Sequence, residues 1–397
     1  MPTKTTSLIF PILLVLYEIA TYLSNDMYLP ALPDMMRDLS LSSKEAQLTL
    51  TTWFVGSAML PLVLGVVSDR YGRRPVLLWG GLVYIMATIA CAVSINSHQL
   101  LIVRFIEGAA IPSMMVAGYA AIHEIYGRKE AIQLLALMSS ITVLAPAFGP
   151  LLGSIILYFS SWRGIFWVIA IWSAIIIGLL FYYMPETLKM EERHPVHIGM
   201  LFKQYGLMLM NKEFMLLNFV IGSIFTGFIA FITAGPLLVM QTFHHTPVTY
   251  GWVMAGIFTA YIIGNYWVKH MLEWTSVNNI IWLGLCVTLC GGFLIFLSAV
   301  MLPNVLYPFL IAMGIYSFGA ALCFAPLNRC IIEASDQPMG LRVSLFTVLW
   351  TGFAVLGSLI VSQHFNGSIP SLAYPITIGI VIACLLKRVE DYGKVNA

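Results

Sequence analysis

A charged loop joins the second and third long apolar stretches of the chain, and it reads GVVSDRYGRRP over residues 65–75. Gly72 suits a tight turn, because glycine adopts backbone conformations that a Cβ atom disfavours. Pro75 suits the first turn of the helix that follows. Asp69 can accept hydrogen bonds at a helix N-terminus, and the arginines can bridge to a neighbouring carboxylate. An ordinary basic loop would explain the arginines, but not Asp69 or the glycine spacing.

The composition around this loop is that of a protein surrounded by lipid. Apolar residues make up 59% of the 397 residues and charged residues only 10%, against about 25% charged residues in a soluble domain. A net charge of +2 gives no support for a nucleic-acid partner. The six cysteines lie in apolar segments, where thiols behave as small hydrophobes. We therefore expect no metal, no cofactor and, without a nucleophile–base pair, no enzyme.

The chain offers twelve stretches of the roughly 20 apolar residues that a membrane-spanning helix needs. The longest polar interruption after the first of them, residues 185–212, leaves six stretches on either side. The sequence thus predicts an all-α membrane protein with twelve transmembrane helices in two six-helix pseudo-symmetric bundles, residues 1–184 and 213–397, joined by a cytoplasmic linker. The expected spans are residues 8–28, 46–67, 76–95, 99–122, 131–157, 164–184, 213–240, 248–268, 278–300, 305–328, 341–363 and 369–386.

Lysine and arginine predict the orientation of these spans. Of the 20 basic residues, sixteen fall on the side of both termini, and only Arg37, Lys44 and Arg163 fall on the other. The positive-inside rule then places both termini in the cytoplasm. The first apolar run is not expected to be a cleaved signal, because Glu18 interrupts it and no small-residue cleavage site follows.

Two carboxylates, Glu18 and Asp26, lie in the first span. An ionised carboxylate in hydrocarbon costs at least a few kcal/mol, so it faces water or a partner and often carries a proton. Glu18, Tyr22 and Asn25 follow each other at i, i+4 and i+7 and share one helix face. Asp26 lies about 12 Å further along the axis, and it could instead be an interfacial cap. Glu18 lies about ten residues into the span, where no such explanation applies.

The fourth span contains an intramembrane cation, Arg104, with Glu107 at i+3. Residues at this spacing can form an ion pair within the helix. Two interpretations are open: the pair neutralises itself and only holds the fold, or Arg104 responds to protonation of the acids in the first span. Glu107 could also titrate.

The fifth span contains two prolines and two glycines, at Pro146, Gly149, Pro150 and Gly153. Small residues let membrane helices approach closely, and proline kinks a helix. A simple kink would also explain them.

On these motifs the chain resembles the major facilitator superfamily and, within it, drug:proton antiporters of the MdfA and Bcr/CflA types. The loop 65–75 matches the superfamily signature between helices 2 and 3. The Gly-Pro-x-x-Gly at 149–153 is similar to the antiporter motif, and residues 27–33 look like the Bcr/CflA exporters. The family pattern in helix 4 is Arg-x-x-Gln-Gly, so the chain departs from it at Glu107.

The resemblance implies a major facilitator fold and roles for particular residues. Glu18, Asp26 and Arg104 would couple protons, and Asp69, Arg73 and Glu124 would form an inside gate. The antiporter motif would be Pro146, Gly149, Pro150 and Gly153. The predicted substrate cavity, which apolar walls with few polar groups suit, comprises Tyr22, Asn25, Glu107, Tyr119, Asn218 and Phe231.

The function implied is export of lipophilic, drug-like small molecules in exchange for protons, by a monomer in the lipid of the bacterial inner membrane. One alternative is a dedicated proton-coupled exporter of a single metabolite, such as a siderophore, a sugar or an amino acid. A non-transporting membrane receptor is a second alternative, against which the acid–arginine set argues. The breadth of resistance conferred on a susceptible host separates the exporter of many drugs from the exporter of a single metabolite.

Overall fold

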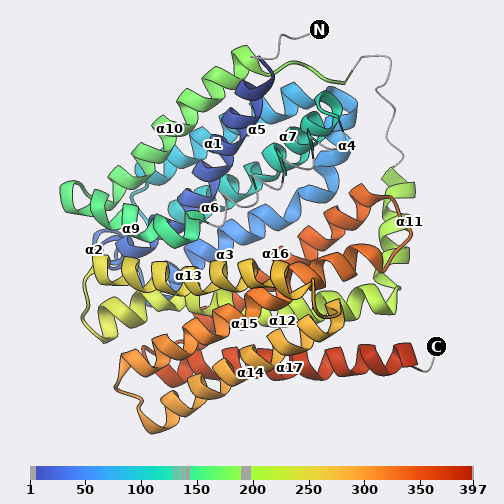
Figure 1. Ribbon diagram of the computed structural model, residues 1–397. Coiled ribbons are helices and arrows are strands. Elements are labelled where there is room, and N and C mark those ends of the chain that lie inside the picture. Colours follow the sequence, from blue (N-terminus) through green and yellow to red (C-terminus); the bar gives the residue numbers. More distant parts are fainter. Residues whose placement is uncertain are drawn as a thin grey trace. The chain divides into compact units, whose positions relative to one another are not determined.

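The computed structural model describes residues 6–127, 130, 131, 134, 135, 138, 144–188 and 198–395. Within these ranges the secondary structure is helical, without strands (Figure 1). Among the described residues, eleven segments are long and apolar enough to cross a membrane. The expected span 131–157 lies partly outside the described residues, and a shorter apolar helix, Leu144–Phe159, covers its second half. The predicted all-α membrane fold is confirmed.

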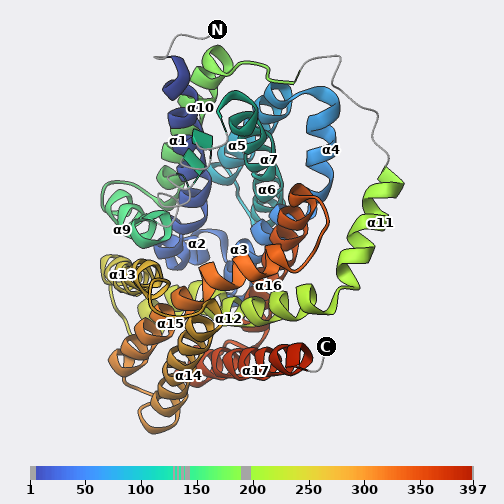
Figure 2. The same cartoon turned by 45° about the vertical axis from the view of Figure 1, so that its right-hand side comes forward.

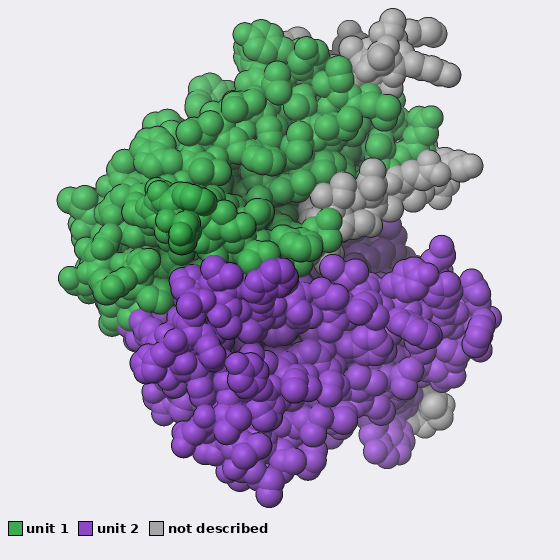
Figure 3. All heavy atoms as spheres, turned by 60° about the vertical axis from the view of Figure 1, so that its left-hand side comes forward, with its two compact units in different colours: residues 1–42, 52–197 green, residues 43–51, 198–397 purple. Residues whose placement is uncertain are grey.

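The chain divides into two compact units (Figure 3). Unit 1 consists of Met1–Ser42 and Thr52–His197, and unit 2 of Ser43–Thr51 and Ile198–Ala397. The predicted division into bundles 1–184 and 213–397 with a linker between them stays a prediction. Within that expected linker the structure has a helix that the sequence reasoning missed, α11 (Ile198–Leu209).

Unit 1 contains two spans that proline divides into two helices each. Proline lacks the N–H that a helix interior needs and favours the first helical turn, so α4 begins at Pro61 and α7 at Pro112. In both views α1 runs alongside α10, with which it packs (Figures 1 and 2). The elements are α1 (Thr6–Asp26), η1 (Leu29–Ala31), α2 (Leu32–Leu39), α3 (Ser43–Met59, whose first nine residues belong to unit 2), α4 (Pro61–Tyr71), α5 (Arg73–Ala92), α6 (Ser97–Ala110), α7 (Pro112–Ile125), α9 (Leu144–Phe159) and α10 (Trp162–Tyr183).

Unit 2 is built from long helices, of which α12 packs against α16 and α17, and α14 against α15. The elements after α11 are α12 (Lys212–Leu237), the π-helical turn η3 (Leu238–Thr242), α13 (Pro247–Met271), α14 (Val277–Met301), α15 (Leu306–Glu333), α16 (Met339–His364) and α17 (Ile369–Val395).

Several helices begin at side chains that cap them. The side chains of Asn96, Asn211, Thr246 and Ser276 each accept a hydrogen bond from the backbone N–H three residues later. Such caps satisfy one of the N–H groups that a helix N-terminus leaves unpaired. These residue types therefore fix where α6, α12, α13 and α14 start.

Candidate functional site

Glu18 lies on α1, inside unit 1, and only 1% of it is exposed. The hydroxyl of Tyr119, on α7, donates a hydrogen bond to Oε1 at 2.6 Å. The other oxygen, Oε2, is buried without a hydrogen-bond partner in the part of the chain that the structure describes. A buried carboxylate with an unpaired oxygen is costly when ionised. A proton on Oε2 or a cationic group beside it would remove this cost, and the proton-coupling role of Glu18 stays a prediction.

Asp26 lies at the C-terminal end of α1, where α9 comes close to the chain. It is 3% exposed, and the amide of Asn25 donates to its Oδ1 at 3.3 Å. A Cβ atom built on Gly149 would lie 2.8 Å from Cβ of Asp26. One built on Gly153 would lie 1.8 Å from the carbonyl oxygen of Met27. The two glycines therefore allow α9 to contact the segment that carries Asp26, as small residues do between membrane helices.

The two prolines of the same motif also belong to α9. Pro146 lies near the start of the described part of the helix, and Pro150 lies inside it. The Ser154 hydroxyl donates to the carbonyl of Pro150 at 2.7 Å. The serine hydroxyl thus bonds back to the carbonyl four residues earlier in a helix that contains a proline.

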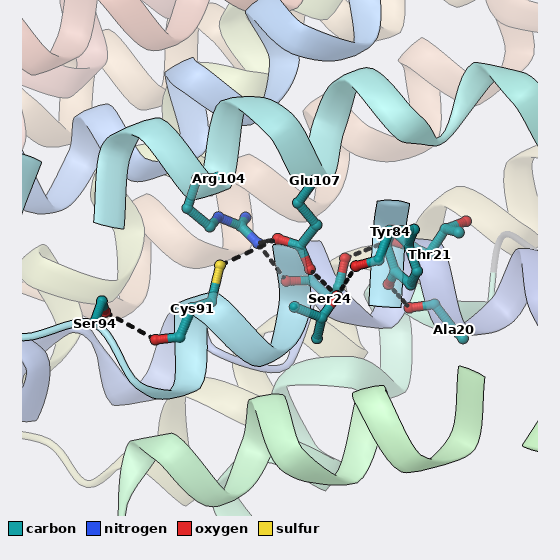
Figure 4. A network of polar contacts seen from close by, with 9 residues as sticks. Ala20, Thr21, Ser24, Tyr84, Cys91, Ser94, Arg104 and Glu107 are labelled. Carbon is teal, nitrogen blue, oxygen red and sulfur yellow. Dashed lines mark hydrogen bonds and ion pairs between the residues drawn. The ribbon is translucent and has the colours of Figure 1, made fainter. Parts of the chain in front are cut away.

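Arg104 and Glu107 form an ion pair in which both side chains are completely buried (Figure 4). Nη1 of Arg104 lies 2.6 Å from Oε2 of Glu107. The Thr88 hydroxyl, on α5, donates to Oε1 at 2.9 Å. The Cys91 thiol lies 3.8 Å from Oε2. Donors from two helices thus surround the carboxylate, as a buried charge requires.

The same arginine connects α6 to α1. Its Nη1 donates to the carbonyl oxygen of Ser24 at 3.0 Å, as Figure 4 shows. Its guanidinium lies 4.4 Å from the ring centroid of Tyr28, within the range of a cation–π contact. The charge of Arg104 also acts on Asp26. Arg104 is therefore placed between its partner Glu107 and the acidic end of α1.

Sequence reasoning missed the residues of α5 that complete this network. Tyr84, Thr88 and Cys91 follow each other at i, i+4 and i+7 and share one helix face. The Tyr84 hydroxyl donates to the carbonyl of Ala20, on α1, at 3.0 Å (Figure 4). A polar stripe at this spacing in an apolar span was the signal that could have found them.

The three residues of the expected inside gate meet at one end of unit 1. Nη1 of Arg73 lies 2.5 Å from Oδ1 of Asp69, and Nε donates to Oε1 of Glu124 at 3.0 Å. Gly72 has a φ of +104° between α4 and α5, a value that favours glycine. This turn brings Arg73 back over the end of α4. A gating role for the three residues stays a prediction.

Two further residues of the predicted cavity lie in unit 2, and each contacts other residues of that unit. Asn218 is buried on α12, and its amide donates to the carbonyl of Phe214 at 2.7 Å. Phe231 is fully buried, with its ring centroid 6.0 Å from that of Phe309. In unit 1, Tyr22 is half-buried on α1. Their role in binding substrate stays a prediction.

Unit 2 also carries a half-buried aromatic cluster on three helices. The ring of Phe225, on α12, stacks on Trp350, on α16, with centroids 3.5 Å apart. Phe324, on α15, meets the same indole at 4.7 Å and a steep angle. Partly exposed aromatic faces of this kind suit flat apolar ligands.

A cavity in the described ranges has none of the acids among its lining residues. It has a volume of about 500 Å³ and lies in unit 1, where the apolar residues of α4, α5 and α6 line it, among them Leu64, Trp79, Val83 and Ile106. Within the same ranges no group of three or more His, Cys, Asp or Glu side chains could hold a metal ion.

Comparison with known proteins points to one family. The family model of the Major Facilitator Superfamily matches residues 14–385. The chain is 28% identical to the multidrug resistance protein MdtM of Escherichia coli K12 over 393 residues, which cover 97% of the chain and 95% of MdtM. It is 30% identical to the multidrug transporter MdfA of Escherichia coli O157:H7 over 352 residues, 86% of the chain and 85% of MdfA.

Solved structures match the fold over nearly the whole chain. The xylose transporter XylE from E. coli, in a partially occluded inward open conformation, superposes with a TM-score of 0.72 at 14% identity. The match covers 96% of the present chain and 97% of XylE.

Proposed function

This chain belongs to the Major Facilitator Superfamily, and we propose that it is a proton-coupled secondary transporter, not an enzyme, that exports lipophilic, drug-like compounds in exchange for protons. Similarity to proteins named for multidrug resistance and multidrug transport supports this proposal. The observation that carries it is Glu18, a carboxylate inside a membrane span with one oxygen bound to Tyr119 and the other unpaired.

The proposed cycle is a competition between protons and substrate for the acids of α1. A proton arriving from outside neutralises Glu18 or Asp26 and removes the cost of a bare charge in a low-dielectric interior. The neutral site is then exposed to the cytoplasm. A substrate binds there, displaces the proton, and is released when the site faces outward again. The energy for export comes from protons that move down their gradient.

Other residues of unit 1 support this exchange. Arg104, which is tied to the carbonyl of Ser24, holds α6 against the part of α1 that carries the acids. Gly149 and Gly153 let α9 contact the same part, so a change at Asp26 reaches α9 directly. Tyr119 and the half-buried Tyr22 are proposed to offer aromatic contacts to a bound substrate.

We also propose the setting in which the protein works. It is a monomer in the bacterial inner membrane with both termini in the cytoplasm, as the distribution of lysine and arginine indicates. The cluster of Asp69, Arg73 and Glu124 then lies at the cytoplasmic end of unit 1 and closes the site on that side. Asn218 and Phe231 are proposed as substrate contacts in the second half of the chain.

Reconstitution into liposomes with an imposed pH gradient tests the function. A panel of lipophilic cations, neutral drugs and zwitterions should yield transport of several chemically unrelated lipophilic compounds. Transport of a single metabolite would instead support the dedicated exporter.

Glu18→Gln tests the part that Glu18 plays. This variant should insert normally, but it should release fewer protons than the wild type when substrate is added and should not transport against a gradient. Asp34→Asn, which removes an exposed carboxylate paired with Arg37, is the matched control. Proton release from Glu18→Gln equal to that of the control would reject the scheme.

A further inference from the structure

The buried charges of unit 1 do not balance. Glu18, Asp26 and Glu107 are three carboxylates that are at most 3% exposed, and Arg104 is fully buried beside them. When all four are ionised, the set carries a charge of about −2 at neutral pH. The tyrosines and the thiol around it are neutral at that pH, since their ordinary pKa values lie between about 8.5 and 10. These neighbours are Tyr17, Tyr22, Tyr28, Tyr84, Cys91 and Tyr119.

The contacts divide the three carboxylates into two kinds. Glu107 contacts Arg104 at 2.6 Å and also accepts the hydroxyl of Thr88, so its charge has partners on the protein. Glu18 accepts a bond from a neutral phenol, Tyr119, and leaves Oε2 unpaired. Asp26 accepts from a neutral amide, Asn25. Arg104 is thus matched in direct contact by Glu107, while the two acids of α1 are bound to uncharged donors.

We propose that Glu107 is the fixed counter-ion of Arg104, and that Glu18 and Asp26 are therefore neutralised together, either by two protons or by one substrate that carries two positive charges. Glu107 acts through Arg104 and is a positioning residue. The substrate class assigned to this site is that of lipophilic dications. This inference rests on the proposed function, since it concerns what the same site exchanges.

The geometry of α1 suits such a ligand. Glu18 and Asp26 are eight residues apart on one helix, which separates them by about 12 Å along the axis. A dication that lies between the two carboxylates brings positive charge toward both of them, whereas a monocation supplies one charge for two acids. A carboxylate left ionised and unpaired in this interior would cost several kcal/mol. With a monocation bound, the remaining acid therefore keeps its proton.

Two dyes that share one ring system test how many protons one bound substrate displaces. Ethidium carries a single positive charge, and propidium carries a second one on a quaternary ammonium side arm. Proton release is measured on the detergent-purified protein after each dye is added, at a pH at which titration shows the free site fully loaded. The wild-type protein should release about one proton for each ethidium and about two for each propidium, since each added positive charge displaces one proton.

Glu107→Gln should remove the difference between the dyes. Without Glu107, Arg104 compensates one acid of α1, and the ionised set carries a charge of about −1, so both dyes should release about one proton. In proteoliposomes the ratio of propidium to ethidium transport should fall about tenfold or more relative to wild type, a change of about 1.4 kcal/mol. Asp34→Asn removes a carboxylate outside the set and should behave as wild type.

The outcomes separate this inference from the function on which it rests. If the wild-type protein neither binds nor transports either dye or any other lipophilic cation, the proposed function fails. If ethidium is exchanged for about one proton but propidium also releases only about one, the inference is overturned while the function stands. The inference is also overturned if propidium releases about two protons from the Glu107→Gln protein. If that variant does not fold, the wild-type comparison of the two dyes decides alone.

Discussion

Replacement of Arg104 by glutamine should destabilise the protein strongly, because it leaves Glu107 as a fully buried carboxylate without its cation. Breaking a buried ion pair from one side costs about 3–5 kcal/mol. For a domain of about 150–250 residues, each kcal/mol lowers Tm by about 2–4 °C. We therefore expect Tm to fall by about 6–20 °C.

Glu107→Gln should cost less than Arg104→Gln. The arginine in that variant keeps its hydrogen bond to the Ser24 carbonyl and its contact with the Tyr28 ring, and its charge still acts on Asp26. The double variant should regain most of the lost stability, since removing both partners of a buried pair is often nearly neutral. The coupling energy between the two sites should therefore be about 3 kcal/mol, at the upper end of the range for residues in contact.

The assay is thermal unfolding of the four detergent-purified proteins, followed by tryptophan fluorescence, at two pH values. The Arg104→Gln protein should be relatively more stable at the lower pH. Its folded state then binds a proton at the uncompensated carboxylate, and a state that binds more protons than the unfolded chain gains stability as pH falls. Additive effects of the two substitutions, or a larger loss from Glu107→Gln than from Arg104→Gln, would refute this account of the buried pair.

Three other substitutions or fusions test separate parts of the structure. Gly153→Ala would place a methyl group 1.8 Å from the carbonyl oxygen of Met27. This overpacking should lower the free energy of unfolding by about 1–3 kcal/mol and slow dye efflux from cells. Gly178→Ala, at a glycine with open space around it, should leave efflux at the wild-type rate. Arg73→Lys keeps the charge but loses the planar fork that contacts Glu124; transport in proteoliposomes should fall several-fold, while the free energy of unfolding falls by only about 1 kcal/mol. A green fluorescent protein fused to the C-terminus should fluoresce and an alkaline phosphatase fused there should be inactive, since the basic loops place that end in the cytoplasm; the reverse pattern would overturn the assigned orientation.

Hydropathy was sufficient to predict the helical membrane fold, because the length of an apolar stretch is set by the thickness of the bilayer. It was less informative about breaks within a span. The divisions of the second and fourth spans at Pro61 and Pro112 are visible in the sequence only as isolated prolines. Proline in a membrane helix either kinks the helix or begins a new one, and neighbouring helices decide between these outcomes. The helix α11 was missed because its 12 mostly apolar residues are too few to span a bilayer and lie in the interruption 185–212, which the sequence predicts to be a polar linker.

What the sequence by itself determined is which residues to propose as functional: Glu18, Asp26 and Arg104 are costly in a membrane, and that cost is evident without any coordinates. Only the tertiary structure decided which groups meet. It connected Arg104 to the Ser24 carbonyl on α1, added Thr88 from α5, and set Gly149 against Asp26. The physical reason is that lipid-facing and protein-facing surfaces of a membrane helix are both apolar, so periodicity shows which residues share a face but not which helix that face contacts.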